Sequence, residues 1–105
     1  MAMSSESRES LLVQRAVSGD AVALTALLTD VRPRVFTHIA RRIPSNLRSS
    51  IDADDIVQNA LVNVYRSVGS FQNRGAGWFY RWVATIAARR LRYARRLHRA
   101  VRRGG

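Results

Sequence analysis

The chemistry most widely available in this chain is that of arginine. All eighteen basic residues are Arg, against seven acids, which gives a net charge of +11. Residues 1–70 hold eight Arg and seven acids, a balance of +1, whereas residues 71–105 hold ten Arg and no acid, a balance of +10. Guanidinium groups make forked contacts with phosphates and stack on bases, although biased codon usage explains an all-Arg composition equally well. Such a basic block indicates a polyanion, most often nucleic acid and less often a membrane surface, with a solvated tail as the plainer alternative.

Five of these arginines share one side of a single predicted helix. The residues Arg89, Arg92, Arg96, Arg99 and Arg103 follow one another at steps of three, four, three and four. At 1.5 Å per residue this stripe is about 21 Å long, which spans several phosphates of a strand.

Catalytic or metal-binding chemistry has little support. His38 and His98 have different surroundings, no Ser or Thr nucleophile stands in a recognisable setting, and no glycine-rich phosphate loop follows a strand. The acids Asp52, Asp54 and Asp55 are spaced closely enough for a metal, but a helix dipole favours acids in a first turn without one. An enzyme is therefore the least favoured class, and we expect no cofactor and no metal.

The composition predicts a soluble cytoplasmic protein. A chain of 105 residues is long enough for one domain with a single core. It has no cysteine, which excludes a disulfide framework and fits a reducing compartment. The first ten residues are polar, and no apolar run approaches the ~20 residues that a membrane-spanning helix needs.

The segment 52–68 has the clearest helical pattern. Its apolar residues recur at steps of three, one, three, one, three and four, which predicts a helix with one buried stripe, capped by Asp52. The stripe consists of Ala53, Ile56, Val57, Ala60, Leu61, Val64 and Val68. The opposite side carries Asp55, Gln58, Asn59, Val62 and Arg66. That side can receive another protein, and a solvated helix surface is the alternative.

Two further helices are predicted before this one. Residues 8–18 form the first, which Gly19 ends, and residues 1–7 are polar enough to be disordered. Residues 21–43 keep a helical period across Pro33, which predicts one long helix kinked at the proline, or two helices that meet there. The unbroken period favours the kink.

The last helix is predicted from residue 76 or 77 to about residue 103. Its apolar side is broad at the start and narrow at the end, and consists of Trp78, Phe79, Trp82, Val83, Ile86, Ala87, Leu91, Ala94, Leu97 and Val101. No segment has the alternation of a strand. The fold class is therefore all-α, a compact bundle of about four helices over residues 8–103 with a long kinked second helix and a long basic last helix.

Two segments carry a more specific pattern. One is DADDIVQNALVNVYRSVGSF and the other is WFYRWVATIAARRLRYARR. In order and spacing they resemble region 2 of bacterial sigma factors, in the extracytoplasmic-function group of the sigma-70 family. The break at Gly19 and Asp20 and the position of Pro33 fit the same family. The resemblance covers residues 8 to 99 and implies a domain for transcription initiation.

The resemblance implies that the first of these segments docks on the clamp helices of the largest subunit of core RNA polymerase. At matching positions, Asp55, Gln58 and Asn59 would make polar contacts, with Val62 and Arg66 further along the same side. The family usually has Glu where this chain has Asn59. The missing carboxylate would weaken core binding by an amount like one charge-assisted hydrogen bond, ~1.5–3 kcal/mol if it is desolvated.

The resemblance also implies that the following loop meets the non-template strand of the promoter −10 element as it melts. A base that leaves the stack needs an aromatic or guanidinium plane and hydrogen bonds to its edge. The residues Gln72, Asn73, Arg74, Trp78 and Phe79 offer both. Trp78 stands where the family tends to have a small polar residue, and a core position is an equal alternative for Phe79.

Further along the last helix, the resemblance implies a second set of DNA contacts. Trp82 shares the alternative of a core position, and Thr85 follows it. Arg89 matches the family position that approaches the duplex at the upstream edge of the −10 element, while Arg92 and Arg96 extend that side toward backbone phosphates rather than bases.

Other interpretations stay open at this point. A general nucleic-acid-binding helical protein without a polymerase partner fits the charge, and an amphipathic basic helix on an anionic membrane is a third possibility that the broad apolar side disfavours. Complete family members carry a second domain that reads the −35 element, and none of it lies before Gly105. We therefore expect a fragment rather than a one-domain relative. The sequence does not say whether an anti-sigma factor is a further partner.

Overall fold

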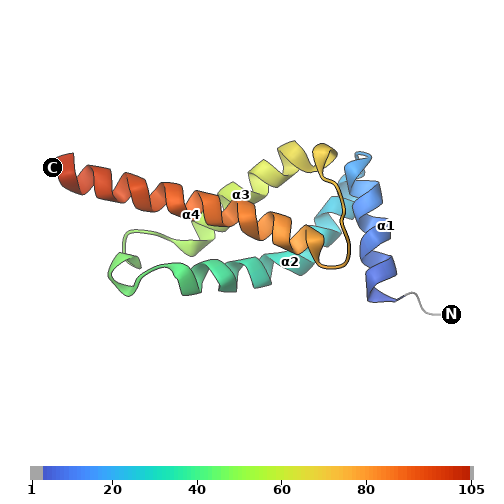
Figure 1. The fold of residues 1–105 in the computed structure, drawn as a ribbon, viewed down its shortest axis with the longest axis horizontal. Coiled ribbons are helices and arrows are strands. Elements are labelled where there is room, and N and C mark those ends of the chain that lie inside the picture. Colours follow the sequence, from blue (N-terminus) through green and yellow to red (C-terminus); the bar gives the residue numbers. More distant parts are fainter. Residues whose placement is uncertain (1–3, 105) are drawn as a thin grey trace.

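A computed structural model describes residues 4–104, and the side chains of residues 4–101. This part of the chain contains helices and no strand. Its four α-helices are α1 (Ser5–Val17), α2 (Ala21–Arg42), α3 (Ala53–Ser67) and α4 (Trp78–Gly104), with two short 3-10 turns, η1 (Ser45–Leu47) and η2 (Val68–Ser70). Figure 1 shows α2, α3 and α4 lying along one long axis, with α1 across one end. The all-α prediction with four helices is confirmed.

The first helix begins earlier than the sequence pattern indicated. The side chain of Ser4 accepts a hydrogen bond from the amide of Ser7 at 3.1 Å, and Glu6 lies in the first turn. A serine cap and an acid at the positive end of a helix both stabilise its start, so residues 5–7 are helical although we expected them to be disordered. Residues 1–3, the rest of that prediction, lie outside the described residues.

The second helix is continuous through its proline. Asp20 caps it by accepting hydrogen bonds from the amides of Val22 and Ala23 at 3.0 and 3.2 Å. Pro33 lies inside the helix, and Figure 1 shows α2 changing direction between its first and second halves. Because proline removes one backbone hydrogen bond and clashes with the preceding turn, it bends a helix without ending it when packing holds both halves. The kinked single helix is the arrangement found.

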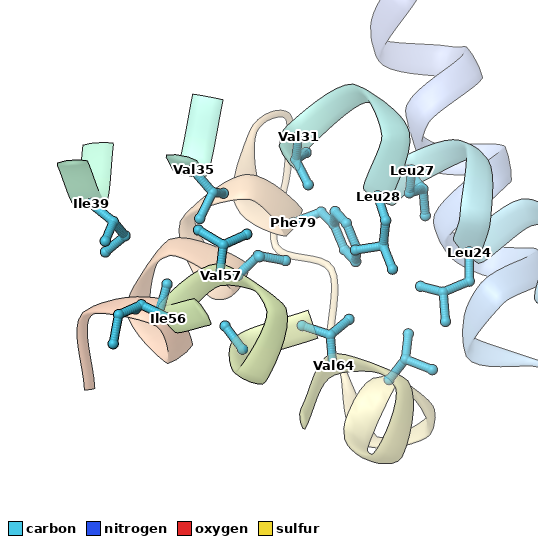
Figure 2. Close-up of a cluster of buried hydrophobic side chains, with 14 of the residues drawn as sticks. Leu24, Leu27, Leu28, Val31, Val35, Ile39, Ile56, Val57, Val64 and Phe79 are labelled. Carbon is cyan, nitrogen blue, oxygen red and sulfur yellow. The ribbon is translucent and has the colours of Figure 1, made fainter. Parts of the chain in front are cut away.

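The core forms around α2, which packs against each of the other three helices. Figure 2 shows its aliphatic side chains meeting those of α3 and the ring of Phe79 from α4. The largest side chains with almost no exposure are Phe79, Ile39, Val35, Val57, Val64 and Val83. Each side chain of this size contributes about 1.5–3 kcal/mol when it is fully buried. In the predicted stripe of α3, Ala53 and Leu61 are only half-buried, and the other five residues are buried.

The last helix begins at Trp78 and runs beyond the bundle. Gly77 has a φ of +75°, outside the right-handed helical region, so the helix cannot include it and starts one residue later than we expected. The last turns of α4 pass the ends of the other helices (Figure 1), and the molecule is 60 Å long but only 23 by 21 Å across. Leu97 and Val101 were assigned to the apolar side, yet they are 49% and 72% exposed. The buried row ends at Leu91.

None of the helices in residues 4–104 combines the length and the apolar character that crossing a membrane requires.

Candidate functional site

The first candidate surface is the outer side of α3. Asp52 starts the helix, since its Oδ1 accepts a hydrogen bond from the amide of Asp54 at 2.9 Å. The helical period then turns the aliphatic stripe toward α2 and leaves the opposite side uncovered. This side, the α3 outer face, consists of Asp55, Gln58, Asn59, Val62 and Arg66, all of them exposed. The structure therefore brings the five predicted residues together on one open face, and their role stays a prediction.

One aromatic residue on this face was missed by the sequence analysis. Tyr65 is 52% exposed and lies three positions after Val62, which is itself 43% exposed. Residues three apart on a helix are neighbours on its surface, so the two side chains form an apolar patch among the polar groups. The spacing to Val62 was the available signal, and Tyr65 extends the α3 outer face.

The second candidate surface begins at a cluster of three aromatic rings. The ring of Phe71 lies 5.7 Å from that of Phe79, edge to face, and 4.7 Å from that of Trp82. Phe79 is only 1% exposed and belongs to the core. The structure thus places Phe79 in the core position that the sequence left as an equal alternative, and a contact of this ring with DNA stays an untested prediction. Trp82 is half-buried and keeps an open side.

Trp78 is the first residue of α4 and directly follows the loop. It is half-buried, and the guanidinium groups of Arg74 and Arg81 lie 5.7 and 5.4 Å from its ring centroid. Both distances permit a cation–π contact, so two positive charges lie close to this aromatic ring. Arg81 was not predicted as a site residue. An aromatic ring with cations close to it is suited to stack on a base whose neighbouring phosphates are negative.

The loop between η2 and α4 has its own internal support. The side-chain oxygen of Asn73 accepts a hydrogen bond from the amide of Gly75 at 3.1 Å, and Gly75 has a φ of +135°. Asn73 therefore shapes the turn with its oxygen, and its amide nitrogen is left to act as a donor. Gln72 and Arg74 are exposed beside it.

The arginines of α4 divide between two sides of the helix. Arg89 lines a hollow of about 530 Å³ between α3 and α4, together with Trp82 and Arg66 of the α3 outer face. Arg92 lines a separate hollow between α2 and α4. Arg96 is exposed and lines neither hollow. Arg89, Arg92 and Arg96 of the predicted stripe thus form a crest on α4 with a hollow on each flank, and Arg103 lies outside the residues whose side chains the structure describes.

Thr85 lies on the same crest. Its Oγ1 donates a hydrogen bond to the carbonyl oxygen of Arg81 at 2.8 Å, which leaves the hydroxyl only as an acceptor for other groups. A phosphate offers no donor near neutral pH, so Thr85 is better placed to accept from a base than to bind the backbone.

Within the described residues, no group of three His, Asp or Glu side chains is arranged to hold a metal ion. The acids at the start of α3 act as a cap and as charges near the helix dipole.

Comparison with known proteins connects these surfaces to a family. The sequence matches the family model described as Sigma-70 region 2 over residues 27–102. It is similar to the ECF RNA polymerase sigma-E factor of Escherichia coli strain K12, with 34% identity over 85 residues, which are 81% of this chain and 41% of that protein. The proteins of the same name from Salmonella typhimurium strain LT2 and Haemophilus influenzae are 33% and 32% identical over the same shares.

The chain spans about two fifths of the length of these curated relatives. The matched segment includes most of α2, all of α3, the loop and nearly all of α4, and therefore both candidate surfaces. This chain belongs to the sigma-70 family, in the group of its ECF members, and residues 27–102 are its region 2.

Proposed function

We propose that this chain is the part of a transcription initiation factor that joins core RNA polymerase to a melted promoter −10 element. The observation that carries the proposal is the meeting of the two surfaces at one hollow. Arg66 of the α3 outer face lines the same depression as Trp82 and Arg89 of α4. A polymerase bound to α3 and a DNA strand bound to α4 would therefore be neighbours.

On the polymerase side, the α3 outer face offers a mixed surface of suitable chemistry. Asp55 and Gln58 are exposed acceptors and donors, and Val62 with Tyr65 supplies an apolar patch at the centre. Interfaces gain most from aromatic anchors surrounded by polar contacts that exclude water. The clamp helices of the largest polymerase subunit are the partner that the family resemblance implies.

On the DNA side, the aromatic planes and the loop would hold the non-template strand. Trp78 and Trp82 are half-buried and leave part of each ring exposed, while Gln72 and Asn73 offer amide groups for base edges and Arg74 adds a charge. Stacking of a base on an aromatic side chain is worth about 1–3 kcal/mol. The buried Phe79 is not included among these DNA-contacting residues, and Arg81, which lies beside Trp78, is added to them.

Melting in this proposal involves no covalent step. The protein stabilises unpaired bases by binding them, and its attachment to polymerase offsets part of the cost of unpairing. The factor would act as a binding protein rather than an enzyme, in the cytoplasm where polymerase meets promoters. An anti-sigma factor, if the protein has one, would compete for the α3 outer face.

The polymerase half is tested by a pull-down with purified core RNA polymerase of the same organism. The double variant Asp55→Ala with Gln58→Ala is expected to lose most of the captured polymerase while its thermal unfolding midpoint stays unchanged. The matched control is Asp30→Ala with Gln14→Ala, which removes the same two side chains at exposed positions on α2 and α1. Equal capture by both double variants would show that α3 is not the docking face.

The DNA half is tested by selection from a randomised pool of short single strands, followed by binding of the selected strand and its scramble at one salt concentration. We expect a clear preference for the selected order of bases. A general nucleic-acid-binding protein, the alternative that the +10 block allows, would bind both strands equally.

A further inference from the structure

A cleft between α2 and α4 lies on the flank of α4 that faces away from α3. It has a volume of about 770 Å³, and an adjoining hollow of about 710 Å³ shares His38, Arg42 and Tyr80 with it. We call the two together the basic cleft. Its charged residues are Arg34, Arg41 and Arg42 from α2 and Arg81, Arg92 and Arg95 from α4.

The basic cleft contains no compensating acid. None of the residues that line either hollow is Asp or Glu. Six guanidinium groups gathered around one depression repel one another, which opposes folding unless an anion is present. Surface arginines elsewhere in proteins commonly alternate with acids, so this concentration of one sign indicates a ligand of the opposite sign.

Contacts on the α2 side keep several of these groups in place. The guanidinium group of Arg34 lies 4.0 Å from the ring centroid of Tyr80, a cation–π contact between the two helices. The Nε of Arg42 donates a hydrogen bond to Nε2 of His38 at 2.9 Å. Arg34, His38 and Arg42 are four residues apart and therefore share one side of α2. An ordered guanidinium fork loses less entropy when it binds a phosphate.

The imidazole of His38 adds no further charge near neutral pH. Burial, and then the charge of Arg42, lower its pKa below the ordinary 6.5. Its Nε2 accepts from Arg42, which leaves the proton on Nδ1. His38 thus orients an arginine, and the guanidinium groups supply the positive charge of the cleft.

We infer that the basic cleft binds the phosphodiester backbone of a nucleic-acid strand, so that the DNA interface of α4 continues onto α2. Arg92 is one of the α4 arginines for which the family resemblance implies a contact with backbone phosphates, and it also lines the cleft. A strand on the crest of α4 would lie with its phosphates toward Arg42 and Arg41 on the facing helix. The inference rests on the proposed function, because that function places a DNA strand on α4. It adds a phosphate-binding role for α2, which recognition of the −10 bases does not require.

The test is the salt dependence of binding to a fluorescent single strand and to a duplex of the same length. The test variant is Arg41→Ala with Arg42→Ala, both exposed in the structure. The matched control is Arg8→Ala with Arg15→Ala, which removes two exposed arginines from α1, far along the chain from the cleft. The unfolding midpoints of both variants are measured first, so that a loss of fold is not taken for a loss of binding.

The plot of log K against log salt has a negative slope. For two lost phosphate contacts we expect the magnitude of that slope to decrease by about 1.4 on the single strand, or by about 1.8 on the duplex. A fall on either form supports the cleft and identifies the form that it binds. The control pair should keep the slope of the unchanged protein. The pair Arg41→Gln with Arg42→Gln, which keeps a long polar side chain, should reproduce the fall.

Unchanged slopes for the Arg41 and Arg42 variants on both forms of DNA would overturn the inference, as would an equal fall in the α1 control. The proposed function is judged separately, by preference for a selected strand over its scramble. If the unchanged protein prefers the selected strand but the Arg41 and Arg42 variants keep the salt slope, the cleft inference is refuted and the proposed function stands. A slope change without the preference keeps the cleft and refutes −10 recognition.

Discussion

The side chain of Glu9 in α1 reaches the start of α4, where its Oε2 accepts a hydrogen bond from the backbone amide of Gly77 at 3.4 Å. Gly77 is the last residue of the loop and directly precedes Trp78. A carboxylate at this end of a helix also interacts favourably with the helix dipole. The first helix, all of which lies outside the matched region 2, therefore holds the end of the loop that the proposed function assigns to DNA.

Replacing Glu9 should loosen the loop without unfolding the domain. We expect Glu9→Ala to cost about 0.3–1 kcal/mol of stability, because one long hydrogen bond and one charge–dipole interaction are lost. Exchange of the Gly77 amide with deuterium, followed by NMR, should become faster in this variant. Glu9→Gln keeps an acceptor, so its Gly77 amide should exchange at a rate between those of the unchanged protein and of Glu9→Ala. Glu6→Ala, which removes an acid one turn earlier in α1, is the control.

The two aromatic residues at the start of α4 should behave oppositely on truncation. Phe79→Ala removes a ring that is 1% exposed, and we expect a loss of about 3–5 kcal/mol in unfolding free energy. Trp78→Ala removes a half-buried ring, so it should lower the unfolding free energy by less than Phe79→Ala does, and it should weaken binding to a single strand by about 1–3 kcal/mol. Thermal unfolding and fluorescence anisotropy give the two values.

A Phe79→Leu variant makes the comparison stricter, since it keeps a large apolar side chain and should fold. If that variant binds a single strand as weakly as Trp78→Ala does, Phe79 contacts DNA after all, and the assignment to the core alone is mistaken.

The helical period predicted α3 well because the buried side of a helix can be read from residues three and four positions apart in the sequence. A three-to-four residue repeat determines which side of a helix is apolar, and it placed Val57 and Val64 inside and Gln58 and Val62 outside. The same repeat was ambiguous at the start of α4. Its apolar side there is broad, and the contacts that bury Phe79 come from other parts of the chain, namely Phe71 of the preceding loop and the core side chains, while Trp82 stays half-buried.

Features that depend on distant parts of the chain were not predictable in this way. The exposure of Leu97 depends on where α2 and α3 end relative to α4. The basic cleft exists because α2 and α4 lie side by side, and no local pattern relates Arg42 to Arg92. The early start of α1 was within reach, because Ser4 followed by an acid in the first turn is a recognised start signal.

Restoring the family's usual acid on the α3 outer face should strengthen the proposed polymerase contact. Asn59 is exposed there, so Asn59→Glu adds a carboxylate without disturbing the core. We expect tighter binding to core polymerase by up to about 1.5–3 kcal/mol if the new group forms a desolvated charge-assisted hydrogen bond. Competition for core polymerase against the unchanged protein measures the difference. Asn46→Glu in η1, also exposed, controls for the added charge, and an equal gain there would exclude a specific contact at position 59.

The titration of His38 connects the basic cleft to stability. Because burial and Arg42 lower its pKa in the folded protein, the unfolded chain binds a proton more readily. Stability is therefore fully present above pH 6.5 and falls as the pH drops from that value through the folded pKa. The charged side chains that line the cleft with His38 are all arginines.

Two-dimensional NMR of the imidazole protons gives the pKa directly, with His98→Gln as the background so that one histidine titrates. Arg42→Ala should raise the pKa of His38 toward 6.5 but leave it below that value, because burial is the larger cause and remains. Adding a single strand should raise the pKa as well, since phosphates in the cleft favour the charged imidazole. A pKa that does not change with Arg42→Ala would mean that this arginine does not face His38 in solution, and the α2 side of the cleft would then lack the order that the hydrogen bond between them indicates.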